Sequence, residues 1–247
     1  MASYQYVYHM DGVSKTYPGG KKCFENIKLN FLPGVKIGVV GVNGSGKSTM
    51  INMISGLFPP SEGSIRLKGA ELAGLPAHKT ARKGVGRTFQ LVRLLPELSV
   101  VENVVAGAVF GHRRRWGKSA EGHAKQLLER VGLGASMGLP ISSLTYIDTK
   151  RVELARALAG DPEVLLLDEW LAGLNPTELS TGIDLVRSLR DEGRTIILVE
   201  HVMDAIRSLC DRCVVMSSGA KIAEGTPAEV LSDPEVIRAY LGEDEDA

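Results

Sequence analysis

The sequence has few aromatic residues, no excess of charge of either sign and no long apolar run. Lysine plus arginine and aspartate plus glutamate each number 29, which argues against nucleic-acid binding through bulk electrostatic attraction. No apolar run approaches the roughly 18 residues that a membrane-spanning helix needs, and the N-terminal stretch MASYQYVYHMDG is too polar for a secretory signal peptide. We therefore expect a cytoplasmic protein that makes no direct contact with nucleic acid and meets membranes only through a partner.

Cysteine is also scarce. Two of the three cysteines, Cys210 and Cys213, form a C-x-x-C pair, a spacing found in zinc and redox sites. There is no second pair and no nearby histidine to complete a zinc site. We expect Cys210 to end a helix and Cys213 to begin the strand CVVM.

A glycine-rich stretch, GVNGSGKS, runs from Gly41 to Ser48 and matches the phosphate-loop pattern G-x-x-x-x-G-K-[ST] at every fixed position. The apolar stretch 36–40 before it indicates a strand, and the apolar periodicity of 47–57 after it indicates a helix. This context predicts a nucleotide-binding loop between a strand and a helix.

The residue types in this loop suit phosphate. Its glycines let the backbone turn tightly and bring amide groups to phosphate oxygens, and the helix that follows adds its positive dipole end. Lys47 should contact the β- and γ-phosphates, and the Ser48 hydroxyl should bind Mg²⁺. The residues expected to bind the nucleotide here are Asn43, Gly44, Ser45, Gly46, Lys47, Ser48 and Thr49.

Two more apolar runs end in polar residues. The run 164–167 fits a central strand of a parallel sheet and is followed by Asp168 and Glu169. Asp168 is predicted to hold Mg²⁺ through water, and Glu169 to accept a proton from the water that attacks the γ-phosphate. The run 196–199 is followed by Glu200 and His201. His201 is predicted to sense the γ-phosphate.

These elements, in this order, resemble the ATP-binding subunits of ABC transporters over about residues 4–243. The resemblance implies an α/β phosphate-loop NTPase (RecA-like) core with an antiparallel β subdomain and an inserted helical subdomain. It implies ATP and Mg²⁺ as cofactors, ATP hydrolysis with Lys47, Glu169 and His201 as catalytic residues, and Gln90 as a Mg²⁺ ligand beside Ser48 and Asp168. Tyr17 stands where the family stacks an aromatic ring on adenine; the alternative is a core tyrosine at a strand end.

Thr145, Tyr146, Ile147 and Asp148 occupy the place of the family's signature, usually L-S-G-G-Q, which acts on the ATP of the opposite subunit. Asn175 belongs to the loop that crosses the dimer interface. Tyr146 and Ile147 replace the signature glycines, and a β-branched residue adopts a positive φ only at a cost. The sequence therefore predicts a loop that sits differently or donates fewer bonds, ahead of a helix beginning near Asp148.

Another departure from the family pattern is Trp170, where the family mostly has proline.

The chain is predicted to form one domain. It comprises a nucleotide-binding core (1–90 with 161–225), a helical subdomain (91–160), and terminal helices with an acidic tail (226–247). Antiparallel strands are expected at 4–8, 26–31 and 64–69. Cap and proline patterns predict helix starts at Asn175, Thr226 and Asp233.

Within the family, GVGRTFQLVRLLPELSVVENVVAG and the closing DPEVIRAYLGE resemble branched-chain amino acid importers. That implies a second, identical or different ATPase subunit, transmembrane permease subunits, and a place on the inner face of the plasma membrane. The first 50 or so residues look closer to ABC-F translation factors, a mixture that a recombinant or designed chain would also show. We favour the importer because its features cover more of the chain. The alternatives are a ribosome-associated ATPase and another soluble ABC ATPase.

The run Arg113–Arg115 with Trp116 interrupts the helical middle. It is either a solvated charged loop or a contact for anionic lipid headgroups, since this subdomain would face the membrane in a transporter.

Overall fold

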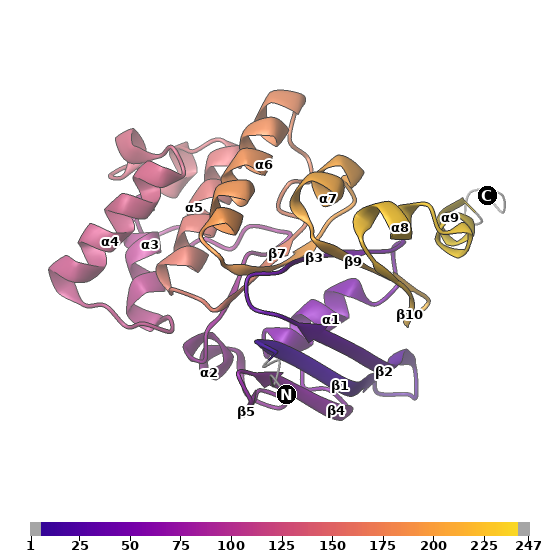
Figure 1. Cartoon of the computed structure of the whole chain (residues 1–247). Coiled ribbons are helices and arrows are strands. Elements are labelled where there is room, and N and C mark those ends of the chain that lie inside the picture. The colour runs from indigo at the N-terminus through magenta and orange to yellow at the C-terminus, as the bar shows by residue number, and fades with distance from the viewer. Residues whose placement is uncertain (1–5, 242–247) are drawn as a thin grey trace, which may run out of the picture.

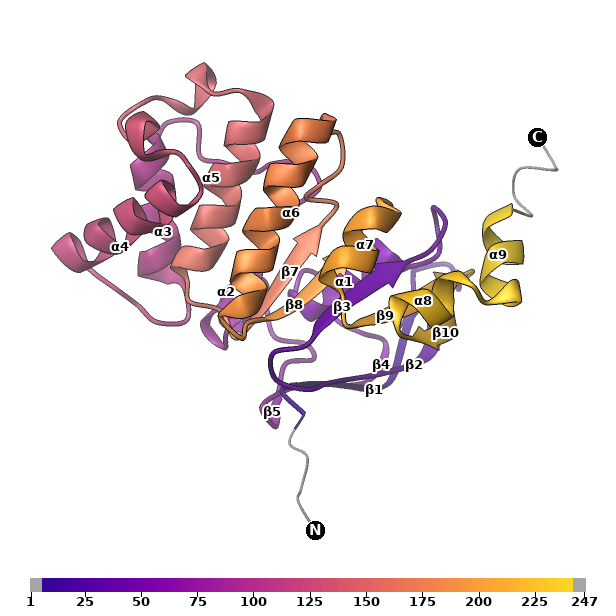
Figure 2. The same ribbon diagram turned by 45° about the horizontal axis from the view of Figure 1, so that its top comes forward.

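A computed structural model describes residues 6–241, which contain two sheets (Figures 1 and 2). The smaller sheet is antiparallel and has the order β2-β1-β4-β5. Its strands are β1 (Tyr8–Thr16), β2 (Lys22–Phe31), β4 (Glu62–Leu67) and β5 (Ala70–Glu71). It forms one outer layer of the molecule.

The larger sheet carries the phosphate loop and has the order β10-β9-β3-β8-β7-β6. All its neighbours are parallel except β10 and β9. Its strands are β3 (Lys36–Val40), β6 (Val85–Arg87), β7 (Val164–Asp168), β8 (Thr195–Val199), β9 (Arg212–Ser217) and β10 (Ala220–Gly225). Because these strands are parallel, the predicted polar residues at their carboxyl ends meet at one edge.

Helices cover both faces of this sheet. Helix α1 (Lys47–Ile54) lies between the two sheets in Figure 1. The others are α2 (Ala77–Arg82), α3 (Val100–Phe110), α4 (Gly117–Arg130), α5 (Tyr146–Ala159), α6 (Pro176–Asp191), α7 (Met203–Leu209), α8 (Pro227–Leu231) and α9 (Pro234–Leu241). Short 3₁₀ turns cover Gly134–Ser136 and Ile141–Ser143.

Alternate side chains of β7 enter two different cores. Val164 and Leu166 pack with α1 and the small sheet, whereas Leu165 and Leu167 pack with the helices of the other face. The unbroken apolar run therefore has a physical cause, since neither face of this strand meets water.

Several predictions of local structure are confirmed. The strands expected at 36–40, 164–167 and 196–199 are present as β3, β7 and β8. Asn175 caps α6, its Oδ1 accepting the amides of Thr177 and Glu178, both at 3.0 Å. Thr226 and Glu229 form a capping box at α8, and Asp233 Oδ1 accepts the Glu235 amide at 2.8 Å ahead of α9.

The first predicted strand was wrong. Residues 4 and 5 lie outside the described residues, Tyr6 and Val7 precede the strand, and β1 runs from Tyr8 to Thr16. Pairing with β2 and β4 recruits the polar segment around Gly12, where the register shifts. Partner strands, rather than the aromatic alternation at the N-terminus, decide this strand's limits. The second and third strands begin earlier than expected, at Lys22 and Glu62.

The cysteine prediction is confirmed. Cys210 directly follows α7, Cys213 is the second residue of β9, and no disulfide joins the three cysteines, which all lie in the described part of the chain. Burial raises the pKa of the Cys213 thiol to about 12, so it stays protonated at neutral pH. Within residues 6–241 no three His, Cys, Asp or Glu side chains gather as a metal-binding group, and no helix there is long and apolar enough to cross a membrane.

Candidate ATP-binding site

The phosphate loop between β3 and α1 forms one wall of a cleft of about 540 Å³. The cleft brings together most of the predicted nucleotide-binding residues, and Glu169 reaches it from β7. The lining residues are Tyr17, Pro18, Lys21, Lys22, Cys23, Asn43, Gly44, Ser45, Gly46, Lys47, Ser48, Thr49, Glu169 and Ser218.

Two glycines of the loop have conformations that other residues adopt only with strain. Gly41 has a φ of 152°, and a Cβ there would lie 2.1 Å from the Met216 carbonyl oxygen. Gly46, with a φ of 101°, is the N-cap of α1. The loop therefore depends on glycine for its path as well as for the access of phosphate to its amides.

Lys47 is buried within this loop. Its Nζ donates to the carbonyl oxygens of Gly41 at 2.5 Å and Val42 at 2.9 Å. Burial lowers the pKa of Lys47, while Glu169 and Asp168 oppose that change. The ammonium group is thus held at the loop's centre, where a bound phosphate chain would meet it.

Glu169 is held by two residues from distant segments. Gln90 Nε2 donates to one carboxylate oxygen at 2.7 Å, and His201 Nε2 lies 3.1 Å from the other. The Glu169 amide donates to the Val199 carbonyl at 2.8 Å, and its φ is 49°, in the left-handed region. The structure therefore joins three residues that the sequence named separately, and aims one carboxylate at the cleft.

Asp168 makes a buried ion pair that the sequence analysis missed. Arg87 Nη2 lies 2.7 Å from Asp168 Oδ2, and both side chains are less than a tenth exposed. Arg87 Nη1 also donates to Asn52 Oδ1 at 2.7 Å and Ser55 Oγ at 2.8 Å. The sequence clue to this ion pair was the arginine three residues before Gln90, in GRTFQ. This pair ties β6 and β7 to α1 beneath the phosphate loop.

The donor set fits Mg²⁺. Mg²⁺ prefers oxygen ligands, usually one or two carboxylates with substrate phosphates and waters. Ser48 presents an exposed hydroxyl, and Gln90 and Asp168 supply an amide and a carboxylate. Asp168 already accepts from Arg87 through Oδ2, which suits a contact through water better than direct ligation.

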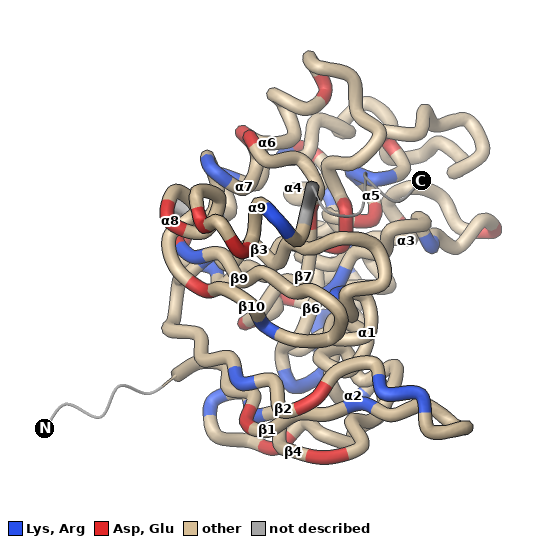
Figure 3. The backbone as a smooth tube through the Cα atoms, turned by 90° about the vertical axis from the view of Figure 1, so that its right-hand side faces the viewer, with Lys and Arg blue, Asp and Glu red and all other residues tan. Residues whose placement is uncertain are grey.

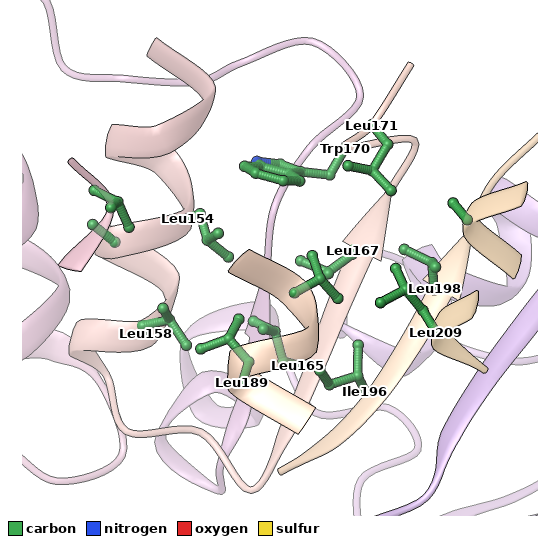
Figure 4. Close-up of a cluster of buried hydrophobic side chains, with 14 of the residues drawn as sticks. Leu154, Leu158, Leu165, Leu167, Trp170, Leu171, Leu189, Ile196, Leu198 and Leu209 are labelled. Atoms are coloured by element: carbon green, nitrogen blue, oxygen red, sulfur yellow. The ribbon is translucent and has the colours of Figure 1, made fainter. Parts of the chain in front are cut away.

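A buried lysine supports the catalytic loop from behind. Lys150, on α5, donates through Nζ to the carbonyls of Ala172 at 2.7 Å, Trp170 at 3.0 Å and Glu169 at 3.4 Å. Trp170 Nε1 donates in return to the Lys150 carbonyl at 3.1 Å, and its ring lies beside Leu171 and above Leu154 and Leu167 in Figure 4. This explains Trp170, which the sequence analysis left without a role.

Replacing Lys150 by methionine should destabilise the fold. The chain keeps its length, but three loop carbonyls lose a charged donor, which costs about 1–3 kcal/mol. Denaturant unfolding measures the loss, and Lys125→Met, at an exposed lysine of α4, is the matched control. Equal unfolding free energies for Lys150→Met and the wild type would contradict this account.

Glu153 links α5 to the segment around Gln90. Its carboxylate accepts the amides of Phe89 at 3.2 Å and Arg93 at 3.0 Å, and Arg156 lies 3.6 Å away. Burial raises the pKa of Glu153, while these amides act in the opposite direction. Charged residues on the buried face of α5, three apart at 150 and 153, were the sequence clue to both contacts.

Glu200 is buried next to Glu169. Its Oε1 accepts the Leu171 amide at 2.6 Å, and its Oε2 has no hydrogen-bond partner among the described residues. Burial raises the pKa of Glu200 from 4.5 to about 7. The group is therefore largely protonated in the folded chain at slightly acidic pH.

This pKa predicts a pH-dependent stability difference. The unfolded carboxyl loses its proton near pH 4.5 and the folded one near pH 7, so the stability that Glu200 supplies falls as the pH rises between these values. Glu200→Gln stays neutral and should gain about 3 kcal/mol relative to the wild type between pH 4.5 and pH 8. Unfolding free energies of both proteins across this range test it; a constant difference would contradict it.

The signature residues do not line the cleft of their own chain. Thr145 caps α5, accepting the Asp148 amide at 3.3 Å and donating to its carboxylate at 2.8 Å. The helix begins at Tyr146, two residues earlier than predicted. Tyr146 and Ile147 lie in its first turn and have no positive φ. Helical backbone suits both side chains, so neither residue needs the positive φ that glycine would allow.

Ile147→Gly should not raise ATPase activity. Glycine inside a helix is roughly 0.5–1 kcal/mol less favourable than alanine and is also less favourable than isoleucine, so the variant should only lose stability. Thermal unfolding and the ATPase rate of the partnered complex are the measurements. A clear rise in that rate would contradict this expectation and would show that Ile147 impairs the signature.

Tyr17 follows β1 at the rim of the cleft. Its hydroxyl lies 3.1 Å from Thr49 Oγ1, and Cys23 Sγ donates to the same oxygen at 3.3 Å. Tyr17 is half-buried and lies outside both apolar clusters, so the alternative of a core tyrosine lacks support. Asn175, at the α6 cap, is exposed and does not line the cleft.

A phosphate loop between parallel strand β3 and helix α1, with an acidic residue pair at the end of β7 across the intervening strand β8, defines a phosphate-loop ATPase. The family profile described as "ABC transporter" matches residues 24–172. The chain belongs to this family and is an ATP-hydrolysing enzyme. A second profile, "Branched-chain amino acid ATP-binding cassette transporter", matches residues 220–246.

Known relatives match nearly the whole chain. "High-affinity branched-chain amino acid transport ATP-binding protein LivG" of Escherichia coli is 39% identical over 91% of this chain and 94% of its own. BraF of Pseudomonas aeruginosa, named for the same transport, has the same identity and coverages. An ATP-binding cassette of an ABC transporter, solved in its ADP conformation, superposes with a TM-score of 0.87 at 27% identity, covering 96% of this chain and 99% of that one. These comparisons do not favour the ribosome-associated alternative.

Proposed function

We propose that the chain is the ATPase subunit of an importer for branched-chain amino acids or related amides. The observation that carries this is the branched-chain profile at residues 220–246, together with relatives of that description along 91% of the chain. The intact cleft and the convergence of Gln90 and His201 on Glu169 support an active ATPase.

In this proposal two ATPase subunits close head to tail around two ATP molecules. Each nucleotide lies between one subunit's phosphate loop and the other's α5 N-terminus. The exposed Thr145 cap and the amides of the first turn of α5 suit a contact with the partner's γ-phosphate. Asn175, exposed on the following loop, is placed to meet the partner as the subunits close.

Within each site the chain's own groups position the reaction. Lys47 neutralises phosphate charge, and Tyr17 stacks on the base. Ser48 and Gln90, with Asp168 through a water, would hold Mg²⁺, which would supply neutralisation of phosphate charge when bound. Glu169 orients the attacking water and takes its proton, while Gln90 and His201 fix the carboxylate. Closure driven by ATP and opening after hydrolysis form a two-state cycle.

This chain has a groove in which a segment of the permease partner could bind. A cavity of about 310 Å³ lies between β6, α3 and α5, and includes Arg87, Phe89 and the exposed Phe110. A permease segment seated there would touch the residues directly before Gln90, and so feel its movement with Glu169. We therefore place the chain at the inner membrane surface through this groove.

A pull-down tests the proposal. Tagged Glu169→Gln protein with ATP is applied to detergent-solubilised membranes and, separately, to ribosomes from the source cells. Hydrophobic permease subunits should be captured and should be lost with Phe110→Arg, but not with Phe58→Arg, an exposed control outside the groove.

The substrate needs a second arm. The captured complex, reconstituted with its binding protein, should raise its ATPase rate with leucine, isoleucine or valine. Stimulation by an unrelated solute would overturn the substrate class. Ribosomal proteins without permease subunits would overturn the importer role.

A further inference from the structure

Two segments of the chain are basic and contain no acidic residue. Residues 77–83 (AHKTARK) and 112–118 (HRRRWGK) hold seven of the 29 lysines and arginines, in a chain whose basic and acidic residues balance overall. The function proposed above uses none of these side chains.

The fold brings the two segments together. His112 Nδ1 lies 2.8 Å from the Arg82 carbonyl oxygen, and the amides of His112 and Arg113 donate to the Gly160 carbonyl. The first segment borders the groove at Ala81, and the second begins directly after the groove residues Phe110 and Gly111. Figure 3 shows basic segments beside the α2 label. We call this surface the basic rim; its members are Lys79, Arg82, Lys83, Arg113, Arg114 and Lys118.

The side chains of the basic rim point to solvent. All six are exposed. Two members have an acidic neighbour among the described residues. Arg113 lies 3.7 Å from Asp161 and is still 72% exposed, and Lys118 is close enough to Glu121 to help lower the pKa of that carboxyl. Arg115, by contrast, is held against Asp161 at 3.0 Å and is not counted in the rim. The other four members, Lys79, Arg82, Lys83 and Arg114, are exposed and form no ion pair within the described part of the chain.

One large aromatic side chain outside the groove stands among these charges in the sequence. Trp116 is 64% exposed. Tryptophan next to basic residues is typical of surfaces that lie at the membrane interface, where the ring enters the headgroup layer and the cations meet anionic lipids.

From these observations we infer that the basic rim binds the anionic phospholipid surface around the permease. The orientation rests on the proposed function, because a permease seated in the groove brings the membrane to the groove's edges. Continuity with that interface favours lipid over RNA, for which stacked bases on Trp116 would be the comparable contact. The contact adds affinity to the docked complex and limits its tilt.

Vesicle binding by the purified full-length chain tests this inference. Co-sedimentation is measured with phosphatidylcholine vesicles and with phosphatidylcholine vesicles that contain about one third phosphatidylglycerol, at low and high salt. Binding should require the anionic lipid, weaken with salt, and fall at least about tenfold in Arg114→Glu/Lys118→Glu, since each basic residue contributes measurably at such surfaces. Trp116→Ser should lower binding further.

The matched control reverses two exposed arginines on other helices, Arg207→Glu/Arg238→Glu. Equal loss with the control, or equal binding to neutral vesicles, would overturn the inference. So would rim-dependent binding of single-stranded RNA without vesicle binding. ATPase rates confirm that each variant is folded.

The two proposals fail separately. Permease capture without rim-dependent vesicle binding would leave the importer role and remove the lipid contact. Rim-dependent vesicle binding by a chain that captures no permease would leave the lipid contact and remove the importer role.

Discussion

Glu169→Gln should slow ATP hydrolysis by roughly 10²–10⁴-fold while leaving ATP affinity nearly unchanged, because a general base contributes about that factor and does not bind the phosphates. The amide keeps a carbonyl oxygen for Gln90 Nε2, so the loop geometry should survive. With ATP, the variant should accumulate as a closed dimer. Phosphate release and the ATP-dependent molecular mass in solution are the measurements.

Glu129→Gln, at an exposed position on α4, is the control and should behave as wild type. Turnover equal to wild type in Glu169→Gln would remove Glu169 from the catalytic role. Slow turnover with equally weakened ATP binding would point instead to a damaged cleft.

Lys47→Ala should weaken ATP binding roughly 10–150-fold, the equivalent of a charge-assisted hydrogen bond of about 1.5–3 kcal/mol. Lys47 also holds the carbonyls of Gly41 and Val42, so part of the loss comes from a looser loop. Isothermal titration of ATP measures the affinity, and ADP separates the β- from the γ-phosphate contribution.

Lys47→Met keeps the apolar stem and should show a similar loss if charge is the cause. Lys125→Ala, on the exposed face of α4, should bind ATP as the wild type does. ATP affinity unchanged in both Lys47 variants would contradict the assignment.

The local pattern of the sequence predicted elements whose environment is uniform along their length. Strands β3, β7 and β8 are apolar throughout because both faces are covered, and α6 and α8 begin where cap residues satisfy free amides. The limits of strand β1 were not predicted correctly. Its pairing partners β2 and β4, which are distant from each other in the sequence, stabilise a segment with weak strand propensity.

The sequence by itself determined the phosphate loop, the acidic pair at the end of β7 and the residues expected around the nucleotide, because those depend on residue types at fixed spacing. Only the tertiary structure decided which distant groups meet. Gln90 and His201 hold Glu169, Arg87 holds Asp168, and Lys150 holds the loop that Trp170 anchors. These contacts join different strands and helices, and the geometry that joins them is set by the packing of the whole sheet, which no local pattern encodes.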